Sequence, residues 1–276
     1  FGTEEQKNLI IPKITCGECY FAIGMSEPDS GSDLASVKTK ATKINGGWNL
    51  EGRKIWSTGA HLSNYMIVLA RTSPALKDNR HEGLSQFLVD LSLPNIKVKC
   101  IEDMTGQKHF NETLFDNVIL SKESLIGEEG KGWSQVVGEL ALERSGPERF
   151  LSHFTLLEKF ISEFRTSLLK SGSSLVGKLI SELQTLRRMS FSVASMLQNG
   201  DSPETKAAFV KELGNRFEKM MIESLREISN IIPLYEWPTS LQNLFEDATL
   251  RIPSNSLRGG TTEIMKGIIA RQLGLR

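Results

Sequence analysis

The sequence is poor in cysteine and carries no excess charge of either sign. Only three of its 276 residues are cysteines: Cys16, Cys19 and Cys100. So few cysteines cannot build a disulfide framework, which favours a reducing compartment. Thirty-three Lys and Arg residues balance thirty-three Asp and Glu residues, so no net field would attract nucleic acid or an anionic membrane. We expect neither as a partner.

Long apolar runs and metal-ligand spacings are also lacking. No run approaches the roughly 18–20 apolar residues that a membrane span needs. Cys16 and Cys19 form a C-x-x-C pair, but no second pair and no histidine cluster accompanies it, whereas a structural zinc site needs four ligands. We therefore expect a protein with no membrane span and no metal site. Its hydrophobic content of 39% and charged content of 24% are those of an ordinary globular chain.

Short runs of β-forming residues, separated by turn residues, fill the sequence from about residue 20 to 120. Strands are predicted over 46–59, 65–73, 84–92, 95–102 and 112–120. The first of them follows Asn45-Gly46-Gly47, which is typical of a hairpin turn. Strands at this spacing predict an antiparallel sandwich or barrel.

The pattern changes after residue 132, where apolar side chains recur every three or four residues. Such spacing predicts helices over 133–164, 173–200, 202–232 and 260–275, with a break at Gly146-Pro147. Residues 1–19 have the character of the end of a helix followed by a loop. The expected fold is thus α+β: a helical remnant at 1–19, a β domain at 20–122, and an α domain at 123–276.

A polar stretch, IGMSEPDSGSD (residues 23–33), follows a short apolar run. Its proline, serines and glycine predict a tight turn after a strand. Glycine lets a ligand approach the backbone, and successive N–H groups with serine hydroxyls can donate to a phosphate or carbonyl oxygen. On these grounds alone a solvated turn is the favoured interpretation, and composition does not decide between the two.

Four separated motifs together resemble the acyl-CoA dehydrogenase family, and they occur in the order of that family. They are MSEPDSGSD (25–33), GRKIWSTGA (52–60), GQKHFNETLFDNVILSKESLIGEEGKGW (106–133) and GGTTEIMKGIIARQL (259–273). The resemblance covers nearly the whole chain. It implies a middle β domain followed by a carboxyl-terminal four-helix bundle, with only the last turn of the amino-terminal helical domain in this chain.

The resemblance implies a flavoenzyme that oxidises an acyl-CoA thioester to its 2-enoyl form, with FAD accepting a hydride at N5. It assigns flavin contacts to Met25, Ser26, Gly31, Ser32, Trp56, Ser57, Thr58, Thr261 and Glu263, and substrate contacts to Ser32 and Arg144. Trp56 alone would be an ordinary core aromatic. Thr261 and Glu263 would alone be read as a helix cap with an acid in the first turn.

The catalytic base is the point at which this sequence departs from most of the family. The usual Y-E-G-T motif is here Arg258-Gly259-Gly260-Thr261, which has no carboxylate. Isovaleryl- and long-chain-type members carry the base in an L-x-x-E-R context, which LALERSG (140–146) matches. The resemblance thus makes Glu143 the base, and the Gly259 N–H a donor to the substrate carbonyl. Alternatively, Glu143 is one more polar residue on its helix, since a second Glu-Arg pair follows at 148–149.

Two family motifs that hold FAD across a subunit interface, R-x-x-F-G and Q-x-x-G-G-x-G-Y, are replaced here. Residues 164–183 and 230–245 stand in their places. Two functions therefore remain open: a dehydrogenase that passes electrons to an electron-transfer flavoprotein, or a non-catalytic or half-site subunit paired with a related chain. The resemblance implies a homodimer, a homotetramer or such a heteromer, in the bacterial cytoplasm or the mitochondrial matrix.

Overall fold

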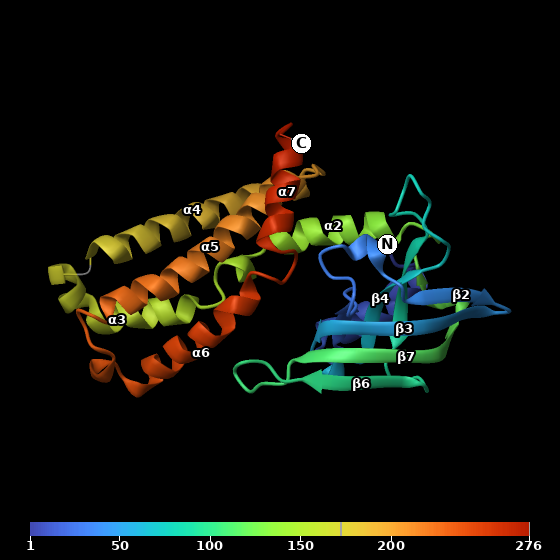
Figure 1. Cartoon of the computed structure of the whole chain (residues 1–276), viewed down its shortest axis with the longest axis horizontal. Coiled ribbons are helices and arrows are strands. Elements are labelled where there is room, and N and C mark those ends of the chain that lie inside the picture. Colours follow the sequence, from blue (N-terminus) through green and yellow to red (C-terminus); the bar gives the residue numbers. More distant parts are fainter. Residues whose placement is uncertain (172, 276) are drawn as a thin grey trace. The chain divides into compact units, whose positions relative to one another are not determined.

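The computed structural model describes residues 1–171 and 173–275, and the chain divides into two compact units, Phe1–Gly138 and Glu139–Arg276 (Figure 1). The division falls within helix α2 (Gly132–Arg144). The expected domain limits at residues 19 and 122 are drawn from the family resemblance, and they stay a prediction.

The first unit is built on one eight-stranded sheet, which does not close. Its strands are β1 (Phe21–Gly24), β2 (Lys40–Ile44), β3 (Gly47–Thr58), β4 (Tyr65–Arg71), β5 (Leu84–Asp90), β6 (Ile96–Ile101), β7 (Phe110–Ser121) and β8 (Leu125–Ile126). Their order is β6-β7-β3-β2-β4-β5-β8, with β1 beside β4. The sheet is mostly antiparallel, although β1 and β2 both run parallel to β4.

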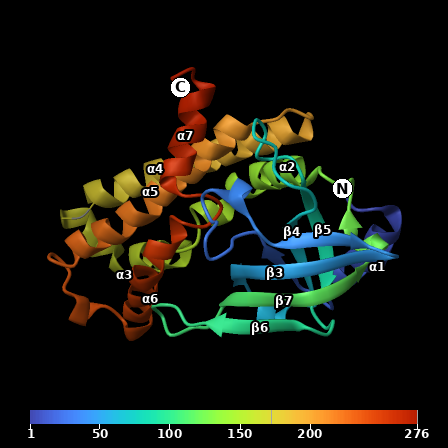
Figure 2. The same cartoon turned by 45° about the vertical axis from the view of Figure 1, so that its right-hand side comes forward.

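The predicted β region is confirmed, but its barrel form is not found. The path of strands ends at β6 on one side (Figure 2) and at β8 on the other, and β8 has only two residues. One face of the sheet is lined by apolar side chains that alternate with polar ones along the strands. Its most buried members include Leu50, Val68, Phe87, Phe115 and Leu120.

Helix α1 (Glu4–Thr15) precedes the sheet and is joined to it by side-chain contacts. Thr3 and Gln6 form a capping box at its start, in which each side chain bonds the other's backbone N–H. The Gln6 amide also donates to the carbonyls of Glu123 (2.7 Å) and Leu125 (3.1 Å). The predicted helix end at residues 1–19 is therefore part of the first unit.

The second unit is a helical bundle, as the 3.6-residue pattern predicts. Its helices are α3 (Phe154–Ser171), α4 (Ser173–Gln198), α5 (Glu204–Ile228), α6 (Thr239–Asn255) and α7 (Thr262–Gln272). Figure 1 shows α3 to α6 running alongside one another, while α7 packs on α5. The core that they enclose includes Phe160, Leu179, Phe217, Leu225 and Trp237.

The break predicted at Gly146-Pro147 is confirmed, because α2 ends at Arg144 and a single 3-10 turn, Pro147–Arg149, precedes α3. This turn packs on α5. Gly214 permits the contact: a β-carbon there would lie 2.5 Å from the Arg149 carbonyl oxygen. Within the described ranges, no helix is long and apolar enough to cross a membrane.

Candidate functional site

The loop of residues 25–33 is fixed to strand β3 by a buried ion pair. The Lys54 ammonium donates to the Glu27 carboxylate (2.9 Å) and to the Met25 carbonyl (2.9 Å), and the two side chains are 0% and 6% exposed. The carboxylate also accepts the backbone N–H groups of Lys38 (2.6 Å) and Thr39 (2.8 Å). The Glu27 carboxylate therefore has partners on two other segments, β3 and the 38–39 backbone.

Burial and their mutual attraction shift the pKa values of Lys54 and Glu27. Burial lowers the pKa of Lys54 to about 8, although Glu27 acts in the opposite direction. Burial also acts to raise the pKa of Glu27, but the Lys54 charge and the donated N–H groups hold it below its usual value. The pair is consequently ionised at neutral pH, and it keeps the 25–33 loop attached to β3.

Trp56 lies at an irregularity of β3 and presents its indole outward. The register with β7 shifts between Lys54 and Ser57, and Trp56 has a φ of 64°, which is unusual for a residue other than glycine. Bulges of this kind redirect side chains. The indole is 57% exposed and meets Phe110 edge to face, with ring centroids 5.9 Å apart. One of its faces is thus open for stacking.

The loop and the bulge are adjacent, because the Ile55 N–H donates to the Ser26 carbonyl (2.9 Å). Met25 and Ser26 are half-buried beside Trp56, and Thr58 is exposed on the same side of the strand. The Ser26 hydroxyl can hydrogen-bond the polar edge of a planar ring, and the open Trp56 indole can stack on its face, so the two together suit a ring such as a flavin. The residues present therefore fit the isoalloxazine of FAD.

The remaining expected flavin residues of this unit are placed differently. Gly31 and Ser32 are exposed on the loop, and a β-carbon at Gly31 would meet nothing within 4 Å, so the backbone is open to a ligand. The Ser57 side chain is 2% exposed and points to the opposite face of β3 from Trp56. Among the described residues its hydroxyl has no hydrogen-bond partner.

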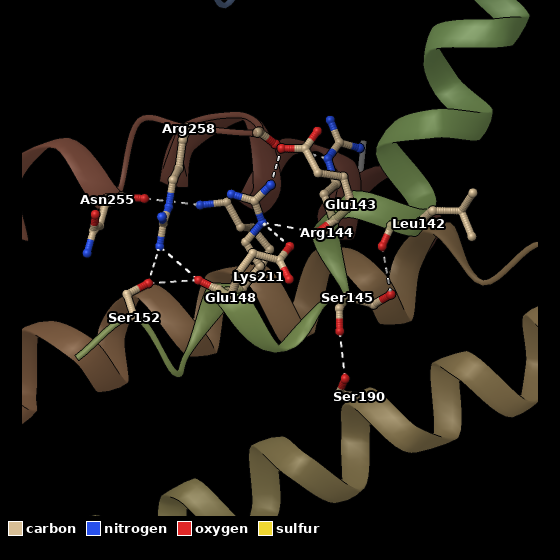
Figure 3. Close-up of polar contacts among 12 residues, drawn as sticks. Leu142, Glu143, Arg144, Ser145, Glu148, Ser152, Ser190, Lys211, Asn255 and Arg258 are labelled. Atoms are coloured by element: carbon tan, nitrogen blue, oxygen red, sulfur yellow. Dashed lines mark hydrogen bonds and ion pairs between the residues drawn. The ribbon is translucent and has the colours of Figure 1, made fainter. Parts of the chain in front are cut away.

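A second cluster lies in the other unit, where the end of α2, the 3-10 turn and the loop after α6 meet (Figure 3). The Glu143 carboxylate pairs with the Arg149 guanidinium, whose Nε also donates to the Glu143 backbone carbonyl (3.1 Å). A β-carbon at Gly259 would lie 3.3 Å from the Glu143 Oε1 and 3.1 Å from the Arg149 Nη2. The structure thus places the two residues predicted for catalysis, Glu143 and Gly259, side by side.

Arg144, the residue next to Glu143, holds the same loop from another direction. Its Nε donates to the Gly259 carbonyl at 3.1 Å. Gly259 and Gly260 have φ values of 65° and 102°, which residues with side chains rarely adopt. The loop conformation therefore depends on both glycines, and the expected contact of Arg144 with substrate stays a prediction.

Thr261 and Glu263 begin helix α7. The Thr261 hydroxyl accepts the Ile264 N–H (3.4 Å), and Glu263 is in the first turn, where it faces the positive end of the helix. The capping interpretation of these two residues is confirmed. Their expected contact with the adenosine half of FAD stays a prediction.

A buried polar network below Glu143 is not predicted by the sequence analysis. Lys211, Asn215 and Glu218 lie one or two turns apart on the buried face of α5. Lys211 donates to Asn215 (2.9 Å) and to the Asn255 carbonyl (3.3 Å), while Glu218 accepts from Asn255 (3.0 Å). The spacing of these three polar residues along an otherwise apolar helix face is the signal that could have revealed the network.

Burial and neighbouring charges shift the pKa values in this network. Burial, with the positive charges of Arg149 and Arg258, lowers the pKa of Lys211 to about 7. Burial raises the pKa of Glu218 despite the hydrogen bonds that it accepts. Arg258 links the network to the turn, since its Nη2 donates to the Glu148 carbonyl (2.9 Å) and the Ser152 hydroxyl (2.6 Å). The turn that carries Arg149 is thus held from several sides.

No metal site accompanies either cluster. Over residues 1–171 and 173–275, no group of three His, Cys, Asp or Glu side chains is placed to hold a metal ion. Cys16 is exposed, Cys19 is buried and Cys100 is half-buried, and all three are free thiols.

Comparison with known proteins gives matches in one family. The sequence profile described as "Acyl-CoA dehydrogenase, middle domain" matches residues 22–118. The solved structure titled "Tcur3481-Tcur3483 steroid ACAD G363A variant" superposes on the whole chain with a TM-score of 0.87, at 26% identity and over 73% of its own length. These matches support assignment to the acyl-CoA dehydrogenase family.

Two curated relatives are similar to nearly the entire chain. Acyl-CoA dehydrogenase FadE34 of Mycobacterium tuberculosis is 30% identical over 99% of this chain. The long-chain specific acyl-CoA dehydrogenase of Rattus norvegicus mitochondria is also 30% identical over 99% of it. The chain spans 37% of the length of the first relative and 65% of the second.

Proposed function

We propose that this acyl-CoA dehydrogenase family member catalyses the FAD-dependent α,β-dehydrogenation of an acyl-CoA thioester. The observation that carries the proposal is the position of the Glu143 carboxylate, 3.3 Å from where a β-carbon at Gly259 would lie. In the family pattern these two positions serve as alternative sites for one base. Here residue 143 has a carboxylate and residue 259 is a glycine. The site therefore contains one base, Glu143.

In this proposal each residue has a defined task. Glu143 accepts the α-proton of the thioester as a general base. The Gly259 N–H donates to the thioester carbonyl and stabilises the negative charge that develops on its oxygen. FAD, when bound, supplies the acceptor for the hydride that leaves the β-carbon. Trp56 offers the stacking surface for its ring, and Ser26 a hydroxyl for the polar edge.

The remaining expectations form part of the same proposal. Ser32 and Arg144 contact the acyl-CoA, and Thr261 and Glu263 contact the adenosine half of FAD. An electron-transfer flavoprotein would be the partner that accepts the electrons. The protein works as a homodimer or homotetramer, in the bacterial cytoplasm or the mitochondrial matrix, where such an acceptor is found.

The experiment that tests this function is an anaerobic titration of the purified, FAD-loaded protein with straight-chain and branched acyl-CoAs, followed by its visible spectrum. Bleaching of the flavin band, with formation of the enoyl-CoA in equal amount, is the expected result. If the protein binds FAD but no thioester of the panel bleaches the flavin band, the dehydrogenase proposal is contradicted.

A second candidate is a half-site subunit of a heteromeric dehydrogenase. It is favoured by one sequence observation: residues 164–183 and 230–245 replace the motifs that hold FAD across a subunit interface in the family. The ratio of FAD to chain in the purified protein separates the candidates. One FAD per chain supports the self-sufficient enzyme, whereas FAD binding that appears only after a related chain is added supports the half-site subunit.

A further inference from the structure

Arg149 is a buried cation placed directly behind the Glu143 carboxylate. Its side chain is 4% exposed, whereas that of Glu143 is 37% exposed. The carboxylate is therefore the outer partner of the pair and the guanidinium is the inner one. A buried guanidinium keeps its charge and needs an anionic partner.

Arg149 contacts Glu143 at two places, which fixes the direction of the side chain. Its Nη2 pairs with the carboxylate, and its Nε donates to the backbone carbonyl of the same residue at 3.1 Å. A planar guanidinium can make both contacts at once, because its N–H groups point in fixed, diverging directions. Glu148 also lies 3.4 Å from the Nε, but its side chain is largely exposed.

The absence of a side chain at residue 259 leaves room for the Glu143–Arg149 ion pair. A β-carbon there would lie 3.1 Å from Nη2 and 3.3 Å from Cζ of Arg149, which is tighter than most such contacts. Three segments therefore meet at the Arg149 guanidinium: the end of α2, the 3-10 turn, and the loop after α6. The guanidinium is the only cationic group that a described salt bridge places on Glu143.

We propose that Arg149 is the positioning residue of the proposed base: it holds the Glu143 carboxylate at the Gly259 position. This inference rests on the proposed function for its chemical meaning. The contact itself stands on the geometry of the pair, and it can be tested without turnover.

The first test measures proton removal alone. Exchange of the acyl-CoA α-hydrogen with D₂O, followed by mass spectrometry, reports the base without requiring net oxidation. Arg149→Met is expected to slow this exchange about 100-fold, the size of effect that misplacing a catalytic group by about 1 Å has. Affinities for FAD and acyl-CoA are expected to stay unchanged. Arg149→Lys keeps the charge but can make only one of the two contacts, so it is expected to restore part of the rate.

The control is Arg226→Met, which removes an exposed arginine that pairs with Glu223 on α5 at 3.1 Å. This variant is expected to exchange at the wild-type rate. Wild-type exchange in Arg149→Met would overturn the positioning role. So would an Arg149→Lys variant as slow as Arg149→Met together with an equal loss of bound FAD, because that pattern indicates a structural role only.

A second test separates this inference from the proposed function. If the wild-type protein exchanges no acyl-CoA at all, the dehydrogenase proposal has failed, yet the contact is still measurable. In a double-mutant cycle of Arg149→Met and Glu143→Gln, urea unfolding is expected to show a smaller loss for the double variant than the sum of the single variants. Additive losses would mean that Arg149 does not hold Glu143.

Discussion

The Glu143 Oε1 lies 3.3 Å from the point that a β-carbon at residue 259 would occupy. A carboxylate brought by the end of α2 thus reaches the place from which a side chain on the 258–261 loop would extend. This relationship explains why residue 259 has no carboxylate: the Glu143 carboxylate already occupies the space that a side chain at residue 259 would need. It also means that changes at either residue should affect the other.

The first prediction distinguishes Glu143 from the neighbouring Glu148. Glu143→Gln keeps the size of the side chain but cannot accept a proton at neutral pH, so flavin bleaching by acyl-CoA should be lost while FAD stays bound. Glu148→Gln should retain bleaching, because the Glu148 side chain is exposed and Arg149 keeps its contact with Glu143. Stopped-flow absorbance measures both. Retained turnover in Glu143→Gln would show that the base has been assigned wrongly.

The second prediction concerns Gly259. Gly259→Ala places a β-carbon 3.1 Å from the Arg149 Nη2 at a φ of 65°, so it should cost about 1–2 kcal/mol of unfolding free energy and slow flavin bleaching. Urea unfolding and single-turnover kinetics measure these effects.

The companion change Gly259→Glu in the Glu143→Gln background should restore part of the activity, since the new carboxylate starts next to the old one. Its recovery should be incomplete because the backbone strain remains. A double variant that binds FAD and acyl-CoA but exchanges no α-hydrogen would contradict the idea that both positions reach the same carbon.

The sequence predicts those parts of the fold that local chemistry decides. The hairpin at Asn45-Gly46-Gly47 and the break at Gly146-Pro147 are both found, because glycine and proline restrict the backbone wherever they occur. Strand β2 is not predicted, since Ala41 is its only buried residue and no alternation marks it. Helix α6 is missed as well, because Pro238 and Pro253 interrupt the pattern around it.

The site likewise has residues that the sequence predicts and residues that it does not. Glu143 and Gly259 are found from the family resemblance, and the structure places them next to each other although 116 positions separate them in the chain. Arg149 and Lys211 are not found, because their importance depends on which segments meet in the bundle. A buried lysine and a surface lysine have the same local sequence character, and only packing tells them apart.

The third prediction concerns the ion pair that joins the 25–33 loop to β3. Lys54→Met leaves the Glu27 carboxylate buried without its partner, which should cost about 3–5 kcal/mol of unfolding free energy. The Met25 carbonyl loses its donor in the same variant, so affinity for FAD should fall.

The double variant Lys54→Met/Glu27→Gln removes both charges and should regain much of the stability. Its affinity for FAD should stay low if the pair also positions Met25 and Ser26. Urea unfolding and flavin fluorescence measure the two quantities. Wild-type affinity for FAD in Lys54→Met would show that the pair has no part in the flavin site.

The fourth prediction concerns the pH dependence that Lys211 gives to stability. Its pKa is about 7 in the folded protein and near 10.5 when unfolded, so between these values the unfolded chain binds more protons. The unfolding free energy should therefore rise with pH above about 7, by up to about 1.4 kcal/mol per pH unit from this group. Below pH 7 both states carry the proton, and the contribution is constant.

Urea unfolding of the wild type and of Lys211→Met at pH 7, 8 and 9 measures this rise. Lys54, whose pKa is about 8 in the folded protein, contributes in the same direction from about pH 8 upward in both proteins. The Lys54 contribution is common to both proteins and cancels from their difference, so the wild-type slope should exceed the variant slope throughout pH 7 to 9, and most between pH 8 and 9, where folded Lys211 has lost its proton. Equal slopes in that interval would mean that the Lys211 ammonium is solvated or paired in the folded state, contrary to its position on the buried face of α5.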